Sequence, residues 1–253
     1  MEARLHHEWE GPAGAPVVVL SHSLGTSLAL WDPQVPALAA RFRILRYDTR
    51  GHGRSGLIAS AFSIADLGRD VLRLLDAQGV DRCHFCGLSI GGLVGMWLGA
   101  HAPERLARLV LCNTATRIGT AESWAARIRA AREQGMAAMA PSVMERWFSA
   151  GFRAQAPDAV ARGRALFEST SPEGFVACAV AIRDADERAD AAAIRLPTLV
   201  VSGSEDPATP PAEGRAIAAG IPGARYVELP AAHLSNLEAP EAFNAALLGF
   251  LAS

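Results

Sequence analysis

The sequence contains no lysine, and all 24 of its cationic side chains are arginines. Schiff-base mechanisms and phosphate-binding P-loops both require a lysine amine, so both are excluded. With 26 acidic side chains the formal net charge is only −2, which provides no basic field for nucleic acid or for an anionic membrane. We therefore expect neither nucleic acid nor a membrane as a partner.

Cysteine is also scarce, with four residues in 253, which is too few for a disulfide framework. Cys83 and Cys86 form a C-x-x-C pair, but they lie in a predicted strand, where such residues are about 10 Å apart and beyond disulfide distance. No run of 18 apolar residues is present, and the start of the chain is charged rather than typical of a signal peptide. These features predict buried thiols and a cytoplasmic protein.

Clusters of histidine, cysteine or carboxylate residues at metal-ligand spacing are lacking. His22 and His52 lie in predicted loops, where each belongs to a local turn. His84 and His101 flank a predicted strand and the helix after it, without a matching acidic residue. We therefore expect structural roles for these four histidines, and neither a metal nor an organic cofactor.

Short apolar stretches alternate with helical stretches through most of the chain, of which half the residues are hydrophobic. The alternation predicts an α/β fold with a mostly parallel sheet between helices, because parallel strands need crossover connections. Leu5–Glu10 alternates in the manner of an edge strand. The other predicted strands are residues 17–20, 42–47, 83–86, 109–113, 198–202 and 225–229.

Local signals mark the starts of several helices. Asp32 followed by Pro33 predicts a helix start, with the aspartate as cap and the proline at the first position. Ser63 and Asp66 have the spacing of a capping box, and the helix that they open is amphipathic up to Gly79. Further helices are predicted over residues 93–100, 212–219 and 240–251.

The pattern changes after residue 115, where strand-like runs give way to helical periodicity up to residue 193. The periodicity is interrupted at Gly135, Pro141, Pro157 and Pro172. We interpret residues 116–193 as a helical cap inserted into a hydrolase-like core that consists of residues 1–115 and 194–253.

A Gly-x-Ser-x-Gly sequence, formed by Gly87, Ser89 and Gly91, lies between an apolar stretch and a helix-like stretch. This context is typical of a nucleophile elbow, a strained turn that holds the serine hydroxyl above a sheet. A Cβ atom at either glycine would collide with the crossing strand and helix. Ser89 is therefore the candidate nucleophile.

A serine hydroxyl needs a base to accept its proton and an acid to orient that base. In an open parallel sheet, these partners are expected on loops after later strands. Asp206 follows the predicted strand 198–202, and His233 follows 225–229. Glu205 is the rival acid; we prefer its neighbour because the shorter side chain holds an imidazole more tightly.

The chain resembles the α/β-hydrolase family, in which serine, acid and histidine follow one another in this order. Within that family it is most similar to the 3-oxoadipate enol-lactonases of the β-ketoadipate pathway. The likeness covers nearly the whole chain, and His22 departs from it, since enol-lactonases often have asparagine there. The segments that carry the resemblance are residues 20–26, 46–53, 85–92, 111–119 with Trp124, and 233–238.

The resemblance implies a role for each residue of the site. Ser89 would be the nucleophile, His233 the general base and then acid, and Asp206 the carboxylate that orients the imidazole. The backbone N–H groups of Leu24 and Ile90 would form the oxyanion hole.

In the cap, the resemblance implies that Trp124 and Arg127 contact the substrate, with Trp147 as a third contact. The first two are three residues apart and so share one face of a helix. The implied substrate is a small anionic lactone, 3-oxoadipate enol-lactone, which arises in aromatic degradation. The residues alone leave open a general carboxylesterase, a C–C bond hydrolase, a cofactor-free perhydrolase and a non-catalytic binding protein.

Overall fold

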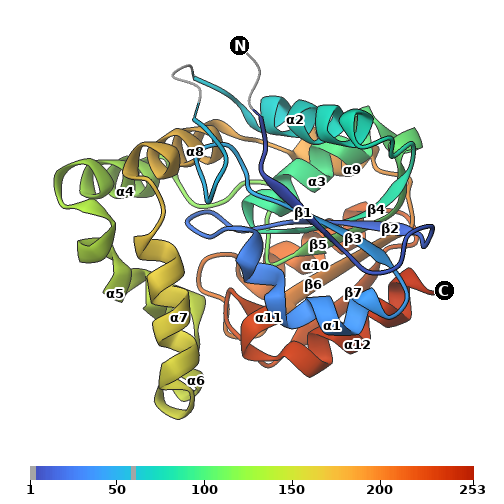
Figure 1. The fold of residues 1–253 in the computed structure, drawn as a ribbon. Coiled ribbons are helices and arrows are strands. Elements are labelled where there is room, and N and C mark those ends of the chain that lie inside the picture. The colour runs from blue at the N-terminus through green and yellow to red at the C-terminus, as the bar shows by residue number, and fades with distance from the viewer. Residues whose placement is uncertain (1–3, 58–60) are drawn as a thin grey trace.

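The computed structural model describes residues 4–57 and 61–253. Its centre is a seven-stranded sheet in the order β1-β3-β2-β4-β5-β6-β7 (Figure 1). All neighbouring strands pair in parallel except β1, which lies antiparallel to β3 at one edge. The strands are β1 (His7–Glu10), β2 (Val17–Ser21), β3 (Arg43–Tyr47), β4 (Cys83–Leu88), β5 (Leu106–Cys112), β6 (Thr198–Gly203) and β7 (Arg225–Leu229). The prediction of a mostly parallel sheet is confirmed.

Helices cover both faces of this sheet (Figure 1). One face carries α2 (Ile64–Ala77), α3 (Ile90–His101) and α9 (Arg188–Ala193), and α3 packs against both of the others. The other face carries α1 (Val35–Ala39), α11 (Ser235–Glu238) and α12 (Pro240–Leu251). One more α-helix of the core, α10 (Pro211–Gly220), packs against β6, β7 and α9.

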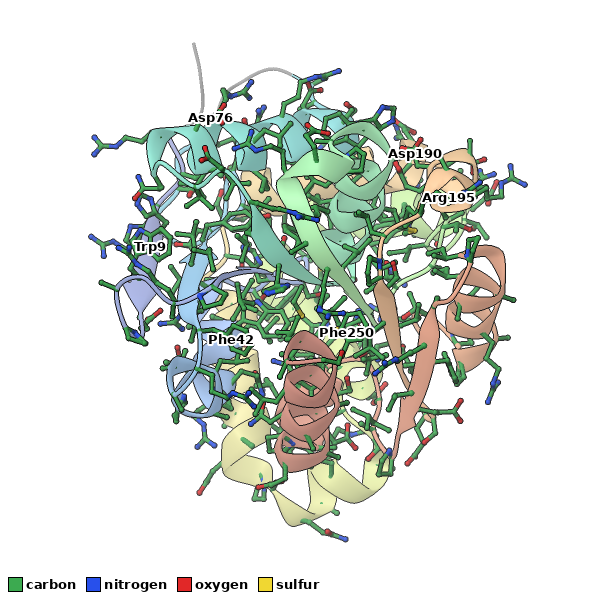
Figure 2. The ribbon with its side chains drawn as sticks, turned by 90° about the vertical axis from the view of Figure 1, so that its right-hand side faces the viewer. Trp9, Phe42, Asp76, Asp190, Arg195 and Phe250 are labelled. Atoms are coloured by element: carbon green, nitrogen blue, oxygen red, sulfur yellow. The ribbon has the colours of Figure 1, made fainter. Side chains whose placement is uncertain are left out.

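The inner strands are mostly apolar because helices exclude water from both faces of the sheet. Every residue of β6 is buried, for example. On the side of the molecule opposite the cap, Phe250 of α12 lies near Arg108 of β5 and Arg225 of β7 (Figure 2). Their guanidinium carbons are 5.4 and 5.8 Å from the centre of its ring. These contacts hold the carboxyl-terminal helix against the sheet.

The capping box at the start of α2 is confirmed. The hydroxyl of Ser63 accepts a hydrogen bond from the N–H of Asp66, whose carboxylate accepts from the N–H of Ser63 at 2.9 Å. The strand at 225–229 and the helix at 240–251 also have their predicted bounds. At these places local chemistry and tertiary packing favour the same structure.

The helix start predicted at Asp32 is wrong. A 3-10 helix, η1, runs from Leu28 to Gln34, and Ser27 is its cap. The carboxylate of Asp32 forms an ion pair with Arg46 of β3 instead of capping a helix. A long-range contact therefore overrides the local Asp-Pro signal.

Between β5 and β6 the chain leaves the sheet and forms helices that gather on one side of the molecule (Figure 1). They are α4 (Ala121–Glu133), α5 (Gly135–Trp147), α6 (Ala150–Gln155), α7 (Pro157–Glu168) and α8 (Pro172–Asp184), and α9 then returns to the sheet. At the junction of α4 and α5, the first residue of α5, Gly135, has φ of +78°, a left-handed conformation that favours glycine. Pro157 and Pro172 are the first residues of α7 and α8.

The interruption predicted at Pro141 is wrong, because this proline lies inside α5. Proline removes one hydrogen bond of a helix and clashes with the preceding turn, which disfavours the helix locally. Here the side chain is exposed, while Met139, Ala140, Val143 and Met144 around it are buried. The packing of that buried face keeps α5 continuous.

Candidate active site

Ser89 lies at a sharp turn between β4 and α3. Its backbone has φ of 59° and ψ of −114°, which is strained for any residue other than glycine. Its N–H donates to the carbonyl of Cys112 at the end of β5, at 2.9 Å. The turn is therefore held by the neighbouring strand, and the serine lies at the carboxyl end of the sheet.

The two glycines of the elbow are required by close contacts. A Cβ on Gly87 would lie 2.0 Å from the carbonyl oxygen of Gly91, at the start of α3. A Cβ on Gly91 would lie 2.4 Å from the carbonyl oxygen of Ser21, at the end of β2. Both collisions involve backbone atoms, as expected for a strand and a helix that cross at the turn.

The loop after β2 brings Leu24 to the same place. The N–H of Gly25 donates to Nε2 of His52 at 3.1 Å, and the N–H of Thr49 donates to Nε2 of His22 at 2.9 Å. Among the described residues, the N–H of Leu24 and that of Ile90 donate to no acceptor of the protein. These two groups are thus left for a ligand, while the histidines hold the loops around them.

The two histidines act as hydrogen-bond acceptors, which requires neutral imidazoles. Burial lowers the pKa of His22 to about 4. Burial, followed by the nearby charge of His22, lowers the pKa of His52 to about 3. Their rings lie 5.5 Å apart, between the loop after β2 and the loop after β3. The local-turn reading of these residues missed that each imidazole joins two loops.

Asp206 and His233 meet at the ends of β6 and β7. Nδ1 of His233 and Oδ2 of Asp206 are 2.9 Å apart, and both side chains are buried. Glu205 is exposed, and the structure brings Asp206, not Glu205, to the imidazole. Since Nδ1 faces the carboxylate, Nε2 is the nitrogen left to accept a proton.

The carboxylate of Asp206 is held in its ionised form. Burial alone would raise its pKa, but the charge of His233 and hydrogen bonds from His233, Thr209 and Asn113 lower it to about 2. The hydroxyl of Thr209 donates to Oδ2 at 2.7 Å, and its N–H donates to Oδ1 at 3.0 Å. The acid therefore keeps its negative charge and its orientation at neutral pH.

Asn113 is a positioning residue that the sequence did not reveal. It follows β5 with φ of 43°, and its side-chain N–H₂ donates to Asp206 at 3.0 Å and to the carbonyl of Ala232 at 3.1 Å. Its carbonyl oxygen accepts from the hydroxyl of Ser235 at 2.6 Å. One amide thus joins the loop of the acid to the loop of the histidine.

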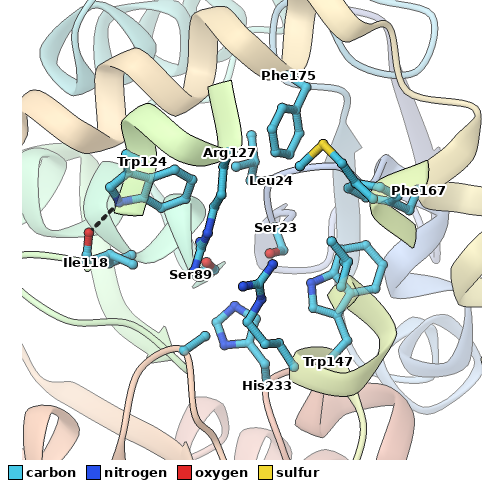
Figure 3. A pocket seen from close by; sticks show the side chains of 14 residues that line it. Ser23, Leu24, Ser89, Ile118, Trp124, Arg127, Trp147, Phe167, Phe175 and His233 are labelled. Carbon is cyan, nitrogen blue, oxygen red and sulfur yellow. Dashed lines mark hydrogen bonds between the residues drawn. The ribbon is translucent and has the colours of Figure 1, made fainter. Parts of the chain in front are cut away.

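A pocket opens above these residues, between the cap and the core (Figure 3). Ser89, His233 and Leu24 line it from the core. The three cap residues of the sequence analysis all line it as well: Trp124, Arg127 and Trp147. Figure 3 shows the side chain of Arg127 extending toward Ser89, with Trp124 to one side and Trp147 facing it across the pocket.

Two guanidinium groups of the cap reach this pocket. Arg127 stacks on Trp124, with 4.5 Å from its guanidinium carbon to the ring centre, and Arg146 enters from α5. Burial, followed by the charge of Arg146, lowers the pKa of Arg127 to about 10, and burial also lowers that of Arg146. Both groups stay protonated at neutral pH.

Arg146 was missed, although the sequence contains a signal for it. Met139 and Val143 also line the pocket, and spacings of four and three residues put all three on one face of α5. An arginine on an otherwise apolar helical stripe faces the same side as the apolar residues.

One more histidine and the four cysteines were also the subject of predictions from the sequence. His101 was expected to lack an acidic partner, but its Nε2 lies 3.1 Å from a carboxylate oxygen of Asp190, a contact formed across 89 residues of chain. All four cysteines are free and buried, so the prediction for Cys83 and Cys86 is confirmed. Within residues 4–57 and 61–253, no three His, Cys, Asp or Glu side chains group as metal ligands.

The cap is tied to the histidine loop by Glu238 of α11. Its Oε2 accepts from the N–H of Ser149, the residue just before α6, at 3.1 Å and from the N–H of Ala232 at 3.0 Å. Its second oxygen accepts from the hydroxyl of Ser149. One carboxylate therefore joins the cap to the residue before His233.

Comparison with known proteins agrees with this geometry. The family model of the alpha/beta hydrolase fold matches residues 16–240, which is most of the chain. The chain belongs to the α/β-hydrolase family. The expected fold and the hydrolase assignment are thereby confirmed, and the pocket of this α/β hydrolase lies at the carboxyl ends of the parallel strands, as in other open sheets.

Two curated relatives are similar over more than nine-tenths of their length. The chain is 38% identical to 3-oxoadipate enol-lactonase 2 of Acinetobacter baylyi over 246 residues, covering 97% of this α/β hydrolase and 92% of the relative. It is 34% identical to RutD of Azorhizobium caulinodans, described as a carbamate hydrolase, over 98% of this chain and 95% of the relative.

Among solved structures, the enol-lactonase from Burkholderia xenovorans LB400 superimposes with a TM-score of 0.97. The two sequences are 46% identical, and the match covers 99% of this α/β hydrolase and 97% of the other chain. The likeness therefore includes the cap as well as the core.

Proposed function

We propose that this protein is a serine hydrolase that opens the lactone ring of 3-oxoadipate enol-lactone. The observation that supports the proposal is the convergence of Ser89, the Asp206–His233 pair and two arginines on one pocket, neither arginine having an ion-pair partner in the described part of the chain. The similarity to enol-lactonases over nearly the whole chain supports the same substrate.

In the proposed mechanism, Ser89 attacks the lactone carbonyl while Nε2 of His233 accepts the hydroxyl proton. The N–H groups of Leu24 and Ile90, which have no acceptor in the described protein, stabilise the developing oxyanion. Loss of one such donor typically raises the barrier by about 2.7–4 kcal/mol. Asp206 holds the imidazole in the required tautomer and stabilises its protonated form.

The carbon–oxygen bond of the ring then breaks and leaves an acyl-enzyme on Ser89. The leaving oxygen is an enolate, which takes the proton from His233 and converts to a ketone. Water, activated by the same imidazole, attacks the acyl carbon and releases 3-oxoadipate with its new carboxylate. No step of this sequence requires a cofactor.

The substrate also carries a carboxylate that does not react. A charge of this kind is costly to bury unless a cation or several N–H donors meet it. Arg127, fixed on the face of Trp124, is the donor that we assign to this carboxylate, with Trp147 against the ring. We assign residues 116–193 to the cap domain that covers the substrate.

The decisive experiment follows the ultraviolet absorbance of enzymatically generated enol-lactone. The wild-type protein is expected to remove the absorbance with saturation kinetics, and Ser89→Ala to be slower by a factor of about 10⁴ or more. Rapid cleavage of p-nitrophenyl acetate without any loss of lactone absorbance would instead support the general carboxylesterase that the sequence left open.

The proposal places the reaction in the degradation of aromatic compounds, and a cytoplasmic location is our expectation for such an enzyme. None of the described helices is both long enough and apolar enough to cross a membrane.

A further inference from the structure

The pocket contains more positive charge than one carboxylate contact needs. Arg127 and Arg146 both line it, and no aspartate or glutamate is among the residues described along its wall. Neither guanidinium forms an ion pair or a hydrogen bond within the described part of the chain. Both side chains are half-buried, whereas most other cap arginines are exposed. Two half-buried cations therefore share one pocket whose described lining holds no carboxylate, and the charge of the exposed Glu145 acts on Arg146 from outside that lining.

The two charges act on each other. The positive charge of Arg146 is a direct cause of the lowered pKa of Arg127, after burial itself. Like charges in a pocket of low polarity repel each other more strongly than they do in water. An anion between them removes this repulsion and supplies the missing hydrogen-bond acceptor for both groups.

The surroundings hold at least one of the two groups in place before any ligand arrives. The guanidinium of Arg127 lies on Trp124, and the indole N–H of Trp124 donates to the carbonyl of Ile118 at 2.6 Å. Arg146 precedes Trp147, whose ring packs at right angles to Phe167 with the ring centres 5.6 Å apart. A site built in this way loses little side-chain freedom on binding.

We propose that Arg146 is a second specificity-determining residue, and that one substrate carboxylate is bound between it and Arg127. This inference deepens the proposed function and rests on it for the identity of the substrate. What it adds is the class of substrate: the two arginines, from two different cap helices, select esters and lactones whose chain carries a carboxylate.

The arrangement also separates recognition from reaction. The pair belongs to α4 and α5, whereas Ser89 and His233 belong to the core. A planar carboxylate offers two oxygens, so each guanidinium can take one of them. The carboxylate end of the substrate is then fixed on the cap, and the carbonyl is directed at the nucleophile.

The test compares Arg146→Gln, Arg127→Gln and the double variant on two matched pairs of substrates. One pair is the enol-lactone and its methyl ester; the other is the p-nitrophenyl monoester of glutaric acid and p-nitrophenyl pentanoate. We expect kcat/KM for the anionic member to fall about 10- to 100-fold in each single variant, because each removes a charged hydrogen bond. For the neutral member we expect a change below about 3-fold.

Arg129→Gln is the matched control, since Arg129 lies on α4 but is exposed and away from the pocket. Arg146→Lys keeps the charge without the planar fork and is expected to recover part of the activity on the anion. Thermal unfolding of each variant verifies that it is folded.

Equal losses on anionic and neutral substrates, or no loss in Arg146→Gln, would overturn the inference. A wild-type protein that opens neither lactone contradicts the proposed function instead. The p-nitrophenyl pair then still decides whether the two arginines select a carboxylate, so the two failures are distinguishable.

Discussion

Asn113 shows how much a single residue contributes at this site. Its backbone has a positive φ, and its side chain bonds to the acid, to the carbonyl before the histidine and to Ser235. Asparagine tolerates this backbone better than most residues do. The same residue therefore satisfies a conformational requirement and aligns two loops.

We expect Asn113→Ala to lower both stability and activity, since it strains the backbone and leaves buried groups unpaired. The strained backbone and each unpaired group cost about 1–3 kcal/mol of unfolding free energy. Asn113→Gly separates the two effects. Glycine relieves the backbone strain, but it does not restore the hydrogen bond to Asp206. The free energy of unfolding should therefore partly recover, while kcat should still fall about 10-fold. Urea unfolding and steady-state kinetics measure the two quantities; full activity in the glycine variant would refute the aligning role.

Gly91 is a single residue at which an added side chain would collide with the backbone. In Gly91→Ala the new Cβ lies 2.4 Å from a backbone oxygen of Ser21, which no side-chain rotation can relieve. We expect a destabilisation of about 3 kcal/mol or more and a displaced nucleophile. Gly249→Ala is the control, because an added Cβ at this exposed position of α12 meets no atom within 4 Å. It should stabilise the helix by about 0.5–1 kcal/mol; equal melting temperatures for the two variants would contradict the prediction.

At the scale of elements, the cap and the histidine loop are joined directly. Glu238 of α11 binds the segment between α5 and α6, and the carbonyl of Trp147 accepts from the N–H of Leu234 at 3.0 Å. The helix that carries Arg146 is thus connected to the residue that follows His233. We therefore expect a change at either end of this connection to displace the other end.

Glu238→Gln tests the connection between α11 and the cap. The amide keeps one acceptor oxygen but loses the charge, so the N–H groups of Ser149 and Ala232 and the hydroxyl of Ser149 are no longer all satisfied. We expect kcat to fall about 10-fold, because the histidine loop shifts, with a smaller change in KM. Ser149→Ala removes only the hydroxyl contact on the cap side and should mainly raise KM. Identical effects of the two variants on both constants would show that the carboxylate does not couple the cap to the loop.

Local sequence patterns predicted helices and strands correctly where no long-range contact opposed the local signal. The alternation of strands and helices, the capping box at Ser63 and the strained turn at Ser89 are all readable because the chemistry lies within a few residues. The predictions at Asp32 and Pro141 were wrong because an ion pair with β3 and the buried face of α5 outweighed the local signal.

The candidate site was likewise predictable only where motifs and chain order point to its residues. Motifs and chain order placed Ser89, Asp206 and His233 in three separate loops, and the structure brings the last two within hydrogen-bond distance. The side chain of Asn113 reaches an acid 93 residues away, and Glu238 reaches a cap residue 89 positions distant. No periodicity in the sequence encodes such contacts, since they depend on how loops from different strands converge.

For the molecule as a whole, the neutral histidines make stability depend on pH. His22, His52 and His84 all have a pKa lowered by burial, to about 4, 3 and 4. In the unfolded chain each would bind a proton near pH 6.5, whereas in the folded protein it does so only near the lower value. The unfolded state therefore binds more protons between these limits, and stability is lost as the pH falls from about 6.5 toward 4.

His22→Asn measures this contribution. The asparagine oxygen can still accept from the N–H of Thr49, but one group with a lowered pKa is removed. The slope of the unfolding free energy against pH should decrease by up to about 1.4 kcal/mol per pH unit between pH 6 and 4.5. Urea unfolding at several pH values, with His7→Asn as the control for removing a histidine elsewhere, gives the slopes. An unchanged slope would mean that His22 is not kept neutral by the fold.

The position of Trp124 has a practical consequence. Of the five tryptophans in the chain, Trp124 and Trp147 are the two that line the pocket. Indole emission responds to nearby carboxylates and to the loss of water, so the pocket contains its own optical reporter. In the Ser89→Ala protein, titration with a carboxylic acid should change the emission in proportion to occupancy, without any attached dye, and Trp124→Phe should remove most of that signal.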